Sequence, residues 1–423
     1  MAINSDYAKQ MATQLAGYEV QSSLDRLNRN EARYKTQRDA LGSLRSALTT
    51  FKSSVGKLRS TSSSMLTNKA TFSHEGYLSA TVGKTAQPGS YQFRVEQLAS
   101  KQQEAVTGLV DGSMDGSLTL NDTAFELAEY STVDDLAKAI NDAKLGVQAT
   151  LVRSNGAVNL VITSEKTGAA NGFGFSASPG ITTVFPPLST AQDALLRMGG
   201  SNGSGGIELT SSTNTFSNVI EGVSLTASKV HQAGDQPLTL DVGQDKAATK
   251  GKAQSFVDAF NALMGSFDSL TASGSESAKR GALAGDSSVR AIESRLNGLL
   301  RTDFGGKSLI NFGISADRNG KLTIDNARFE AAVAADPAGF EALFTGKDNL
   351  LESIDKTVNA YTSSANGMLK NRLDSLDMGL RRVNEQFDNL QQQYDSHYSR
   401  YLKQFTTMMQ TMQSMEQTYG MFG

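Results

Sequence analysis

Residues 369–422 read LKNRLDSLDMGLRRVNEQFDNLQQQYDSHYSRYLKQFTTMMQTMQSMEQTYGMF. Apolar side chains recur in this stretch at alternating steps of four and three, with one extra step of four and with His397 interrupting the series: Leu369, Leu373, Leu376, Leu380, Val383, Phe387, Leu390, Tyr394, Tyr401, Phe405, Met408, Met412, Met415, Tyr419 and Phe422. Such spacing keeps one seam of a helix facing a partner helix. We therefore expect one long coiled-coil helix with a single stutter, able to extend about 80 Å at about 1.5 Å per residue.

A second stripe with this spacing lies near the start of the chain, where Glu31 and Arg38 interrupt it: Leu24, Leu27, Tyr34, Leu41, Leu44, Leu48, Phe51, Val55 and Leu58. Either stripe alone is also typical of an ordinary helical core. Two such stripes at the two ends of the chain, with a different sequence pattern between them, favour a rod built from both termini. Residues 1–23 are only weakly amphipathic, through Tyr7, Met11, Leu15 and Tyr18, which is typical of a terminus that becomes ordered on binding a partner.

The middle of the chain has the alternation and the turn residues of β-strands. We expect strands at 77–82 and 91–98 joined by a turn at 87–90, a hairpin at 117–120 and 123–127, strands at 147–153 and 157–163, and strands at 219–227 and 238–242. Ser131 is the expected cap of one short helix, 133–144. The stretch 172–206 is rich in glycine, serine, threonine and proline, which predicts loops or short edge strands.

Helical patterns return at about residue 247. One amphipathic face consists of Ala253, Phe256, Val257, Phe260, Leu263, Met264, Phe267 and Leu270. Capping and turn residues further along the chain predict four more elements: a helix capped by Asp286 or Ser287, a hairpin about Asn319-Gly320, a helix capped by Asp325 and a helix opened by Asp336-Pro337. The order helical, β-rich, helical indicates a β-rich middle inserted into a helical frame.

The composition excludes several kinds of chemistry. Cysteine is absent from the 423 residues, so disulfides, thiolate metal sites and cysteine nucleophiles are excluded. The net charge of −3 shows neither a dominant basic patch nor an acidic tail, and we expect no nucleic-acid partner. The start of the chain lacks the pattern of a cleaved signal peptide, and no apolar run approaches the roughly 18 residues of a membrane span. These facts alone favour a soluble cytoplasmic protein, with no membrane insertion.

The motifs that hint at catalysis or metal binding fail on their spacing. The Gly-Lys-Ser at 306–308 would need a further glycine where Arg301 stands to form a phosphate-binding loop. The Asp-Arg-Asn-Gly at 317–320 places its glycine too early for a calcium loop, and a hairpin turn explains it. His397 lies on the seam, where a register or interface residue is expected. We therefore predict that the chain is not an enzyme, with no catalytic, cofactor-binding or metal-binding residues and no cofactor.

The end of the chain has the composition of a binding surface. Five methionines fall within fourteen residues: Met408, Met409, Met412, Met415 and Met421. The flexible, polarizable thioether suits surfaces that pack against more than one partner, although methionine also simply fills cores. We predict that the partner contacts of this tip are Phe405, Met408, Met412, Met415, Tyr419 and Phe422.

Short strings spread along nearly the whole chain resemble, in the same order, those of the flagellar filament cap family, also called hook-associated protein 2. The strings are YKTQRDALGSLRSAL (34–48), PGSYQFRV (88–95), QLA (97–99), LVITSEKTG (160–168), AQDA (191–194), IEGVSL (220–225), FVDAFN (256–261), FGI (312–314), GKLTID (320–325) and YLKQF (401–405). Each string is weak alone, whereas their shared order is specific. The chain departs from the family at Met408-Met409, where many relatives carry Leu-Asp.

The resemblance implies a non-enzymatic assembly factor at the distal tip of the bacterial flagellum. In this family the paired terminal helices form a leg among flagellin subunits, and the β-rich head keeps exported flagellin from escaping to the medium and guides its ordered polymerisation. The resemblance further implies a homo-oligomer, usually a pentamer, that is served by the flagellar export apparatus and its chaperone. The chain would be secreted uncleaved through the export channel, which overrides the cytoplasmic expectation.

The predicted fold class is therefore a multidomain α+β chain, with paired N- and C-terminal coiled-coil helices forming a leg and a β-rich head inserted in the middle. We expect four parts: 1–43 plus 385–423 as the coiled-coil leg, 44–74 plus 248–384 as a mainly helical leg domain with a hairpin, 75–108 plus 185–247 as a β-rich head domain, and 109–184 as an inserted α+β head domain. Alternative functions are cell adhesion by an adhesin that binds a host surface or glycan, another flagellar axial or junction protein, and a hydrolase with an unrecognised site.

Overall fold

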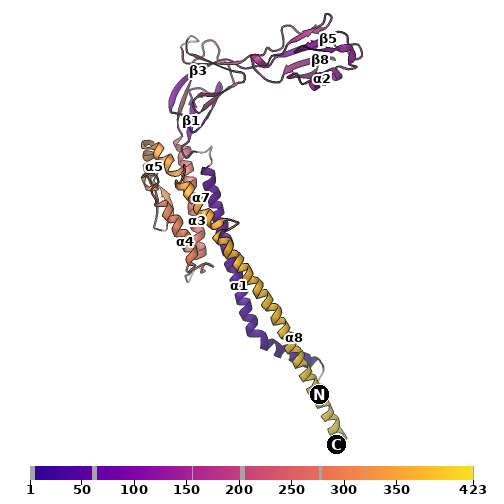
Figure 1. Cartoon of the computed structure of the whole chain (residues 1–423), viewed down its shortest axis with the longest axis vertical. Helices are drawn as coiled ribbons and strands as arrows, with labels where there is room; N and C mark the ends of the chain where they lie inside the picture. Colours follow the sequence, from indigo (N-terminus) through magenta and orange to yellow (C-terminus); the bar gives the residue numbers. More distant parts are fainter. Residues whose placement is uncertain are drawn as a thin grey trace. The chain divides into compact units, whose positions relative to one another are not determined.

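The computed structural model describes residues 5–59, 64–154, 156–200, 205–275, 279–318 and 320–422, except the side chains of Ser5, Met421 and Phe422. The chain divides into two compact units (Figure 1). The helical unit comprises Met1–Met65 and Ala247–Gly423, and the β-rich unit comprises Leu66–Lys246. The predicted fold class is confirmed, because the N- and C-terminal helices pack together and the middle of the chain is β-rich.

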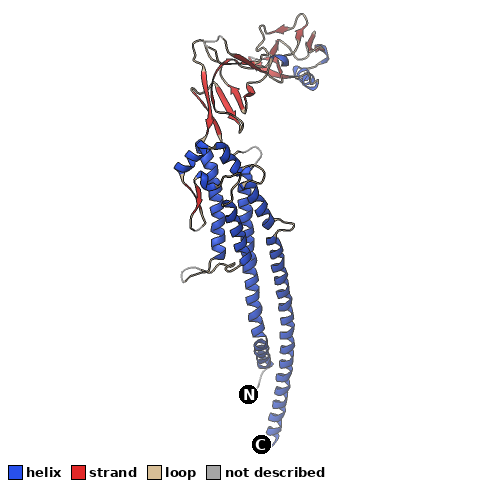
Figure 2. Ribbon diagram, turned by 60° about the vertical axis from the view of Figure 1, so that its left-hand side comes forward, coloured by secondary structure: helices blue, strands red, loops and turns tan. Residues whose placement is uncertain are grey.

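The helical unit is built around two helices of 55 residues each, α1 and α8. Figure 2 shows that helices dominate this unit. Its elements are α1 (Ser5–Arg59), α3 (Lys246–Thr271), α4 (Ser287–Leu300), a 3-10 turn η3 (Leu309–Phe312), the hairpin β16 (Ile314–Ala316) and β17 (Leu322–Ile324), α5 (Asn326–Ala335), α6 (Pro337–Phe344), α7 (Leu350–Thr362) and α8 (Met368–Phe422). Helix α7 is the one helix of the described chain that the sequence patterns did not predict.

Side-chain caps define where the shorter helices begin, as the sequence predicted. The Asp286 carboxylate accepts from the backbone N–H groups of Ser288 and Val289 at the start of α4. Asp325 caps α5 in the same way, and Asp336 caps α6, whose first residue is Pro337. Of the two proposed caps for α4, Asp286 is therefore the correct one. Asn319 of the predicted hairpin turn lies outside the described residues.

A cluster of phenylalanines forms the core of the helical unit. Phe51 of α1 packs against Phe256 and Phe260 of α3, with ring centroids 6.5 and 5.9 Å apart. Phe340 of α6 contacts a further set of rings, at 5.1 to 5.5 Å: Phe312, Phe329 and Phe344. Most of these pairs are edge-to-face, the geometry that aromatic quadrupoles favour. The predicted apolar face of α3 is thus the face that joins α1 to the rest of the unit.

The described residues of the β-rich unit form four sheets and the short helix α2 (Val133–Asp142). The strands are β1 (Asn68–Phe72), β2 (Leu78–Val82), β3 (Gly89–Gln97), β4 (Gln103–Thr107), β5 (Ser117–Leu120), β6 (Thr123–Glu126), β7 (Val147–Ser154), β8 (Ala157–Ser164), β9 (Phe175–Ala177), β10 (Thr182–Thr183), β11 (Ala194–Met198), β12 (Ile207–Ser211), β13 (Thr215–Ile220), β14 (Val223–Ala227) and β15 (Leu238–Gln244). Their orders are β1-β15-β3-β11-β12, β13-β14-β2, β10-β4-β8-β7 and β6-β5-β9, and every pairing is antiparallel.

The β-rich unit has two separate hydrophobic cores. One lies between the five-stranded sheet and the β13-β14-β2 sheet and includes Phe93, Leu196, Leu225 and Leu240. The other surrounds α2 and includes Leu118, Leu136, Ile140, Leu160 and Ile162. Helix α2 packs against β7. Two cores within one stretch of chain arise because each pair of sheets buries its own apolar faces.

His231 closes the edge of β3 where the β15 pairing ends. Its backbone N–H donates to the Val95 carbonyl, and its Nδ1 accepts from the Val95 N–H at 3.0 Å. The imidazole stacks on Tyr77, whose hydroxyl donates to Asp235. Burial and the nearby Arg94 lower the pKa of His231, which keeps the ring neutral and able to accept this hydrogen bond.

Several sequence predictions in the β-rich unit are wrong, and each error concerns pairing or a boundary. Gly89 and Ser90, which were expected in a turn, begin β3, and the strands on either side of that turn pair elsewhere, β2 with β14 and β3 with β15 and β11. β11 is an inner strand rather than a loop or short edge strand, and its Ala194 and Leu196 are fully buried. The single strand expected at 219–227 is the hairpin β13-β14, which turns at Gly222 with φ +74°.

The short helix α2 begins at Val133, as predicted, but its cap is one residue later than expected and the helix ends earlier than predicted. Thr132, not Ser131, is its N-cap: the Thr132 hydroxyl accepts from the Asp135 N–H, while the Asp135 carboxylate accepts from the Thr132 N–H. This reciprocal capping box satisfies two backbone donors that the helix leaves free. At the other end Lys144 has φ +49°, a left-handed conformation that cannot continue the helix.

Candidate partner-binding site

Helices α1 and α8 pair in antiparallel fashion, and their apolar stripes form the seam between them. One part of this seam, here called the upper seam, buries four side chains: Val20, Leu27, Val383 and Leu390. Half-buried side chains flank them: Leu24, Tyr34, Phe387 and Tyr394. These residues belong to the two stripes that the spacing singled out, apart from Val20. The expectation that the termini pair through their stripes is therefore confirmed in the upper seam.

The two helices come close at Gly379, a buried residue of α8. A methyl group added at its Cα would lie 3.4 Å from the ring of Tyr34, so the absence of a side chain lets that ring lie against the α8 backbone. The residues that interrupt the α1 stripe make charged contacts instead. Arg38 pairs with Asp377 of α8 at 3.5 Å, and Glu31 pairs with Lys35 at 2.7 Å. Charges beside a seam fix its register without adding much stability.

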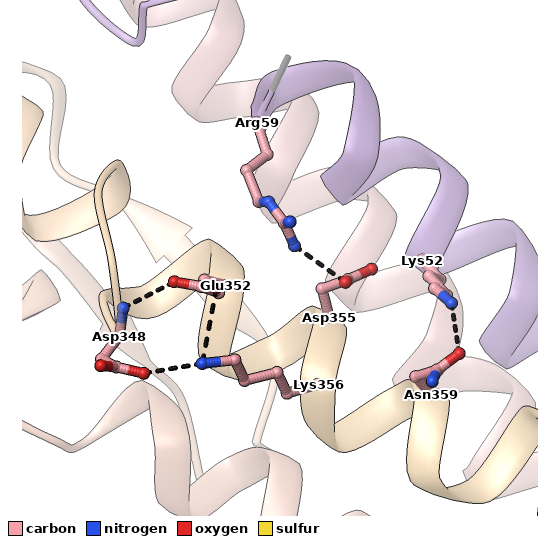
Figure 3. Close-up of polar contacts among 7 residues, drawn as sticks. All are labelled: Lys52, Arg59, Asp348, Glu352, Asp355, Lys356 and Asn359. Atoms are coloured by element: carbon pink, nitrogen blue, oxygen red, sulfur yellow. Dashed lines mark hydrogen bonds and ion pairs between the residues drawn. The ribbon is translucent and has the colours of Figure 1, made fainter. Parts of the chain in front are cut away.

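At its C-terminal end α1 is held by polar contacts to α7. Lys52 Nζ donates to the Asn359 side chain at 2.6 Å, and Arg59 pairs with Asp355 at 2.8 Å (Figure 3). Lys52 and Arg59 lie two turns apart on α1, while Asp355 and Asn359 lie one turn apart on α7, and the two contacts position α1 lengthwise on α7.

The start of α7 has its own polar network in the same view. Lys356 pairs with Asp348 at 2.7 Å and with Glu352 at 3.5 Å (Figure 3). The Asp348 hydrogen bond raises the pKa of Lys356, and the backbone N–H of Asp348 lowers the pKa of Glu352. The network gives α7 a charged N-terminal turn in place of a side-chain cap.

The first residues of α1 pack through alanines. Ala8, Ala12 and Ala16 are almost completely buried, whereas Tyr7 and Tyr18 are exposed. The interpretation of residues 1–23 as a terminus that becomes ordered on binding is wrong from Ser5 onward, because α1 is already helical there. The face was also misassigned: the alanines at every fourth position, not the larger side chains, lie on the buried side.

A polar clasp holds this alanine segment to α8. The Tyr401 hydroxyl donates to Glu19 at 2.6 Å, and Arg400 lies 3.7 Å from the same carboxylate. Arg400 also donates to Nδ1 of His397 at 3.0 Å and covers the ring of Tyr401. The Tyr401 hydrogen bond lowers the pKa of Glu19, and His397 and Arg400 act in the same direction. His397 therefore lies at the helix interface, as predicted.

Beyond the clasp, α8 continues past the described start of α1 (Figure 1, Figure 2). From Gln410 to Gly420 every residue of α8 is exposed, whereas Tyr401, Phe405 and Met409 are half-buried. Residues 408–422 are here called the tip segment, and most of its described side chains are uncovered. At about 1.5 Å per residue this segment is roughly 20 Å long.

The predicted contact residues lie mostly on this tip segment. Phe405 is half-buried beside the last paired turn. Four of the others are exposed on one face of α8: Met408 (45%), Met412 (42%), Met415 (60%) and Tyr419 (82%). The side chain of Phe422 lies outside the described residues. The tip segment thus presents an uncovered continuation of the seam.

The sequence patterns missed both devices that hold the lower part of the pair. The alanine stripe was overlooked because alanine carries little weight in an apolar pattern, although its spacing of four was visible. The clasp joins Glu19 to Tyr401 across most of the chain, and no local signal links these two residues. Lys52 and Arg59 were missed for the same reason, since α7 itself was not predicted.

The described residues contain no cluster of three histidine, cysteine or acidic side chains that could hold a metal ion. Within the same ranges, every helix is too short or too polar to cross a lipid bilayer. The described geometry is thus a pair of long helices whose apolar seam continues into an exposed segment at the end of α8.

Comparison with known proteins identifies the family. Residues 191–417 match the flagellar hook-associated protein 2 C-terminus, residues 7–102 match the N-terminus of the same family, and residues 113–166 match the flagellin hook IN motif. The lateral flagellar hook-associated protein 2 of Vibrio parahaemolyticus is 36% identical over 97% of this chain and 98% of its own length. The A-type flagellar hook-associated protein 2 of Pseudomonas aeruginosa is 29% identical over 97% of this chain and 93% of its own. The chain belongs to the flagellar hook-associated protein 2 family.

A solved structure supports the same assignment. The D1-D2-D3 domains of the flagellar cap protein FliD from Escherichia coli align with a TM-score of 0.66 and 26% identity. The alignment covers 80% of this chain and 99% of the solved one. The resemblance inferred from the short strings is therefore confirmed along the chain.

Proposed function

We propose that this chain caps the distal tip of the flagellar filament, where it promotes ordered polymerisation of exported flagellin and prevents its loss to the medium. The observation that carries the proposal is likeness over the full length: a hook-associated protein 2 matches 97% of the chain, and a flagellar cap protein shares its fold. The role is structural, with no catalysis and no cofactor. Adhesion and a junction role are not favoured, because relatives of one kind match along the whole chain.

The proposal includes the partners and the place of action. The chain works as a homo-oligomer, a pentamer by analogy with the family, and contacts flagellin. It is secreted through the flagellar export apparatus, with the help of a chaperone, and acts at the filament tip. The four-part division proposed from the sequence remains a working scheme for this assembly, with the leg at 1–43 plus 385–423 and the innermost head domain at 109–184.

The leg contacts flagellin through Phe405 and through five residues of the tip segment of α8: Met408, Met412, Met415, Tyr419 and Phe422. Four of these side chains expose large apolar surface on one helix face. A contiguous exposed apolar face marks an interaction site in a soluble protein. Methionine adapts its shape to irregular neighbours, which suits a leg whose flagellin neighbours change as the filament grows.

The test uses a strain that lacks the gene. We expect short or absent filaments and abundant flagellin monomer in the medium, both corrected by the full chain. A chain truncated after Gln404 keeps the upper seam and the clasp but lacks the tip segment, and we expect it to fail. Normal filaments without leakage in the deletion strain would refute the cap function. Rescue by the truncated chain would refute only the role of the tip segment.

A further inference from the structure

The thirteen methionines of the chain are unevenly exposed. Met65, Met114 and Met264 are buried in the cores of the two units. Met408, Met412 and Met415 are exposed, and their spacing of four and three places them on one face of the tip segment. The exposed thioethers of the described chain are therefore concentrated where the helix pair ends, with Met378 as the fourth exposed one.

Methionine supplies all the sulfur of this chain. The chain has no cysteine, so a two-electron oxidant such as hydrogen peroxide has only thioethers as sulfur targets. In this reaction the methionine sulfur gains one oxygen atom from the peroxide, the O–O bond breaks, and the peroxide is reduced to water. Accessible thioethers react first, because buried ones must wait for local opening of the fold.

We propose that Met408, Met412 and Met415 form an oxidation-sensitive surface, at which conversion to methionine sulfoxide weakens the contact of the tip segment with its partner. The chemical part of this inference follows from exposure alone, and the effect on contact rests on the proposed function. Oxidation turns a flexible apolar side chain into a polar one and so disrupts methionine-rich interfaces. Three sulfoxides on one face would remove most of the apolar character of the tip segment, leaving Tyr419 as its remaining exposed apolar side chain among those described.

Met378 provides a matched control within the same helix. It is 54% exposed, comparable with the tip methionines, but its neighbour Gly379 is the residue that faces α1. Oxidation of Met378 therefore changes an exposed surface that takes no part in the seam. If sulfoxide formation at any exposed position weakened binding, oxidation of Met378 would weaken it as much as oxidation of the tip methionines does.

The first experiment treats the full chain with dilute hydrogen peroxide and follows each methionine by peptide mass spectrometry. We expect Met378, Met408, Met412 and Met415 to react at least about tenfold faster than Met65, Met114 and Met264, because the buried set reacts only after local opening. Equal rates for the two sets would overturn the inference. This outcome is independent of whether the chain caps a filament.

The second experiment measures binding of the treated chain to the ends of purified flagellin filaments. We expect oxidation to weaken binding, and a chain carrying Met408→Leu, Met412→Leu and Met415→Leu to bind normally before and after peroxide. Met378→Leu should give no protection. Unchanged binding of a fully oxidised tip would overturn the sensitivity of this surface. Failure of the untreated chain to bind would instead refute the proposed function, and with it the effect on contact, while leaving the oxidation rates as measured.

Discussion

The upper seam and the tip segment of α8 share one apolar spacing and differ in what covers it. In the upper seam, Val383 and Leu390 are buried against α1. In the tip segment, Met412 and Met415 occupy equivalent seam positions and are exposed. The difference lies in what covers the face, because α1 side chains pack against the upper seam, whereas α8 continues past the described start of α1 (Figure 2). A seam pattern therefore indicates that a helix has an apolar face to bury. It does not indicate which segment or which partner covers that face.

The largest effect expected from this comparison is the removal of a seam side chain. Leu390→Ala deletes a buried side chain, and we expect it to lower the free energy of unfolding of the helical unit by about 2–5 kcal/mol. Met415→Ala removes an exposed side chain, and its effect should stay within about 0.5 kcal/mol. Denaturant titrations of the full chain, followed by helical circular dichroism, measure both. Equal losses would show that the tip segment is also covered within the chain.

Two glycines of α8 give a matched pair for the effect of added volume. Gly379→Leu places a side chain against the ring of Tyr34, and we expect overpacking to cost about 1–3 kcal/mol. Gly420→Leu meets no neighbouring atom within 4 Å and should be neutral or slightly stabilising, because leucine favours helix more than glycine does. The same titrations compare the two variants. A destabilising Gly420→Leu would indicate that the tip segment packs against something in the isolated chain.

The ion pair of Arg38 with Asp377 should contribute less than either apolar contact. Both side chains are about half exposed, so solvent screens their attraction. We expect Asp377→Asn to cost about 0.2–1 kcal/mol and to lose this cost in high salt. A double-mutant cycle with Arg38→Gln isolates the pair. A larger, salt-independent coupling would contradict the assignment of stability to the apolar seam.

The clasp at Glu19 should give the smallest effect, with a defined pH dependence. The Tyr401 hydroxyl lowers the pKa of Glu19 below its ordinary value of 4.5. A lowered pKa means that the stabilisation is present above pH 4.5 and is lost as the pH falls through the lowered value. We expect Tyr401→Phe to melt below the unmodified chain at pH 7, and the gap to shrink as the pH is lowered further and further below 4.5. A gap that stays constant over this range of pH would rule out the carboxylate as the acceptor that matters.

Local patterns were sufficient for most of the helices and for the caps of α4, α5 and α6. The spacing of three and four predicted α8 nearly from end to end, and Asp325 and Asp336-Pro337 begin α5 and α6 as expected. These features depend on interactions within one or two turns of the chain, so neighbouring residues carry the information. The candidate contact residues follow from the same spacing, and their role in binding remains a prediction.

Long-range pairing could not be read in the same way. A strand pattern shows that β2 has one face to bury, but β14 lies more than a hundred residues away and has no local link to it. β11 was taken for loop or edge structure because its neighbours are rich in glycine and serine, while the sheet places it between β3 and β12. Alanine and glycine act in this protein through close approach, at Ala12 and Gly379, which a hydrophobic pattern does not register. The amino-acid order was enough to define α8 and the apolar stripes that meet in the upper seam. The partner of each face was decided by packing between distant segments, because burial depends on which surfaces meet in space.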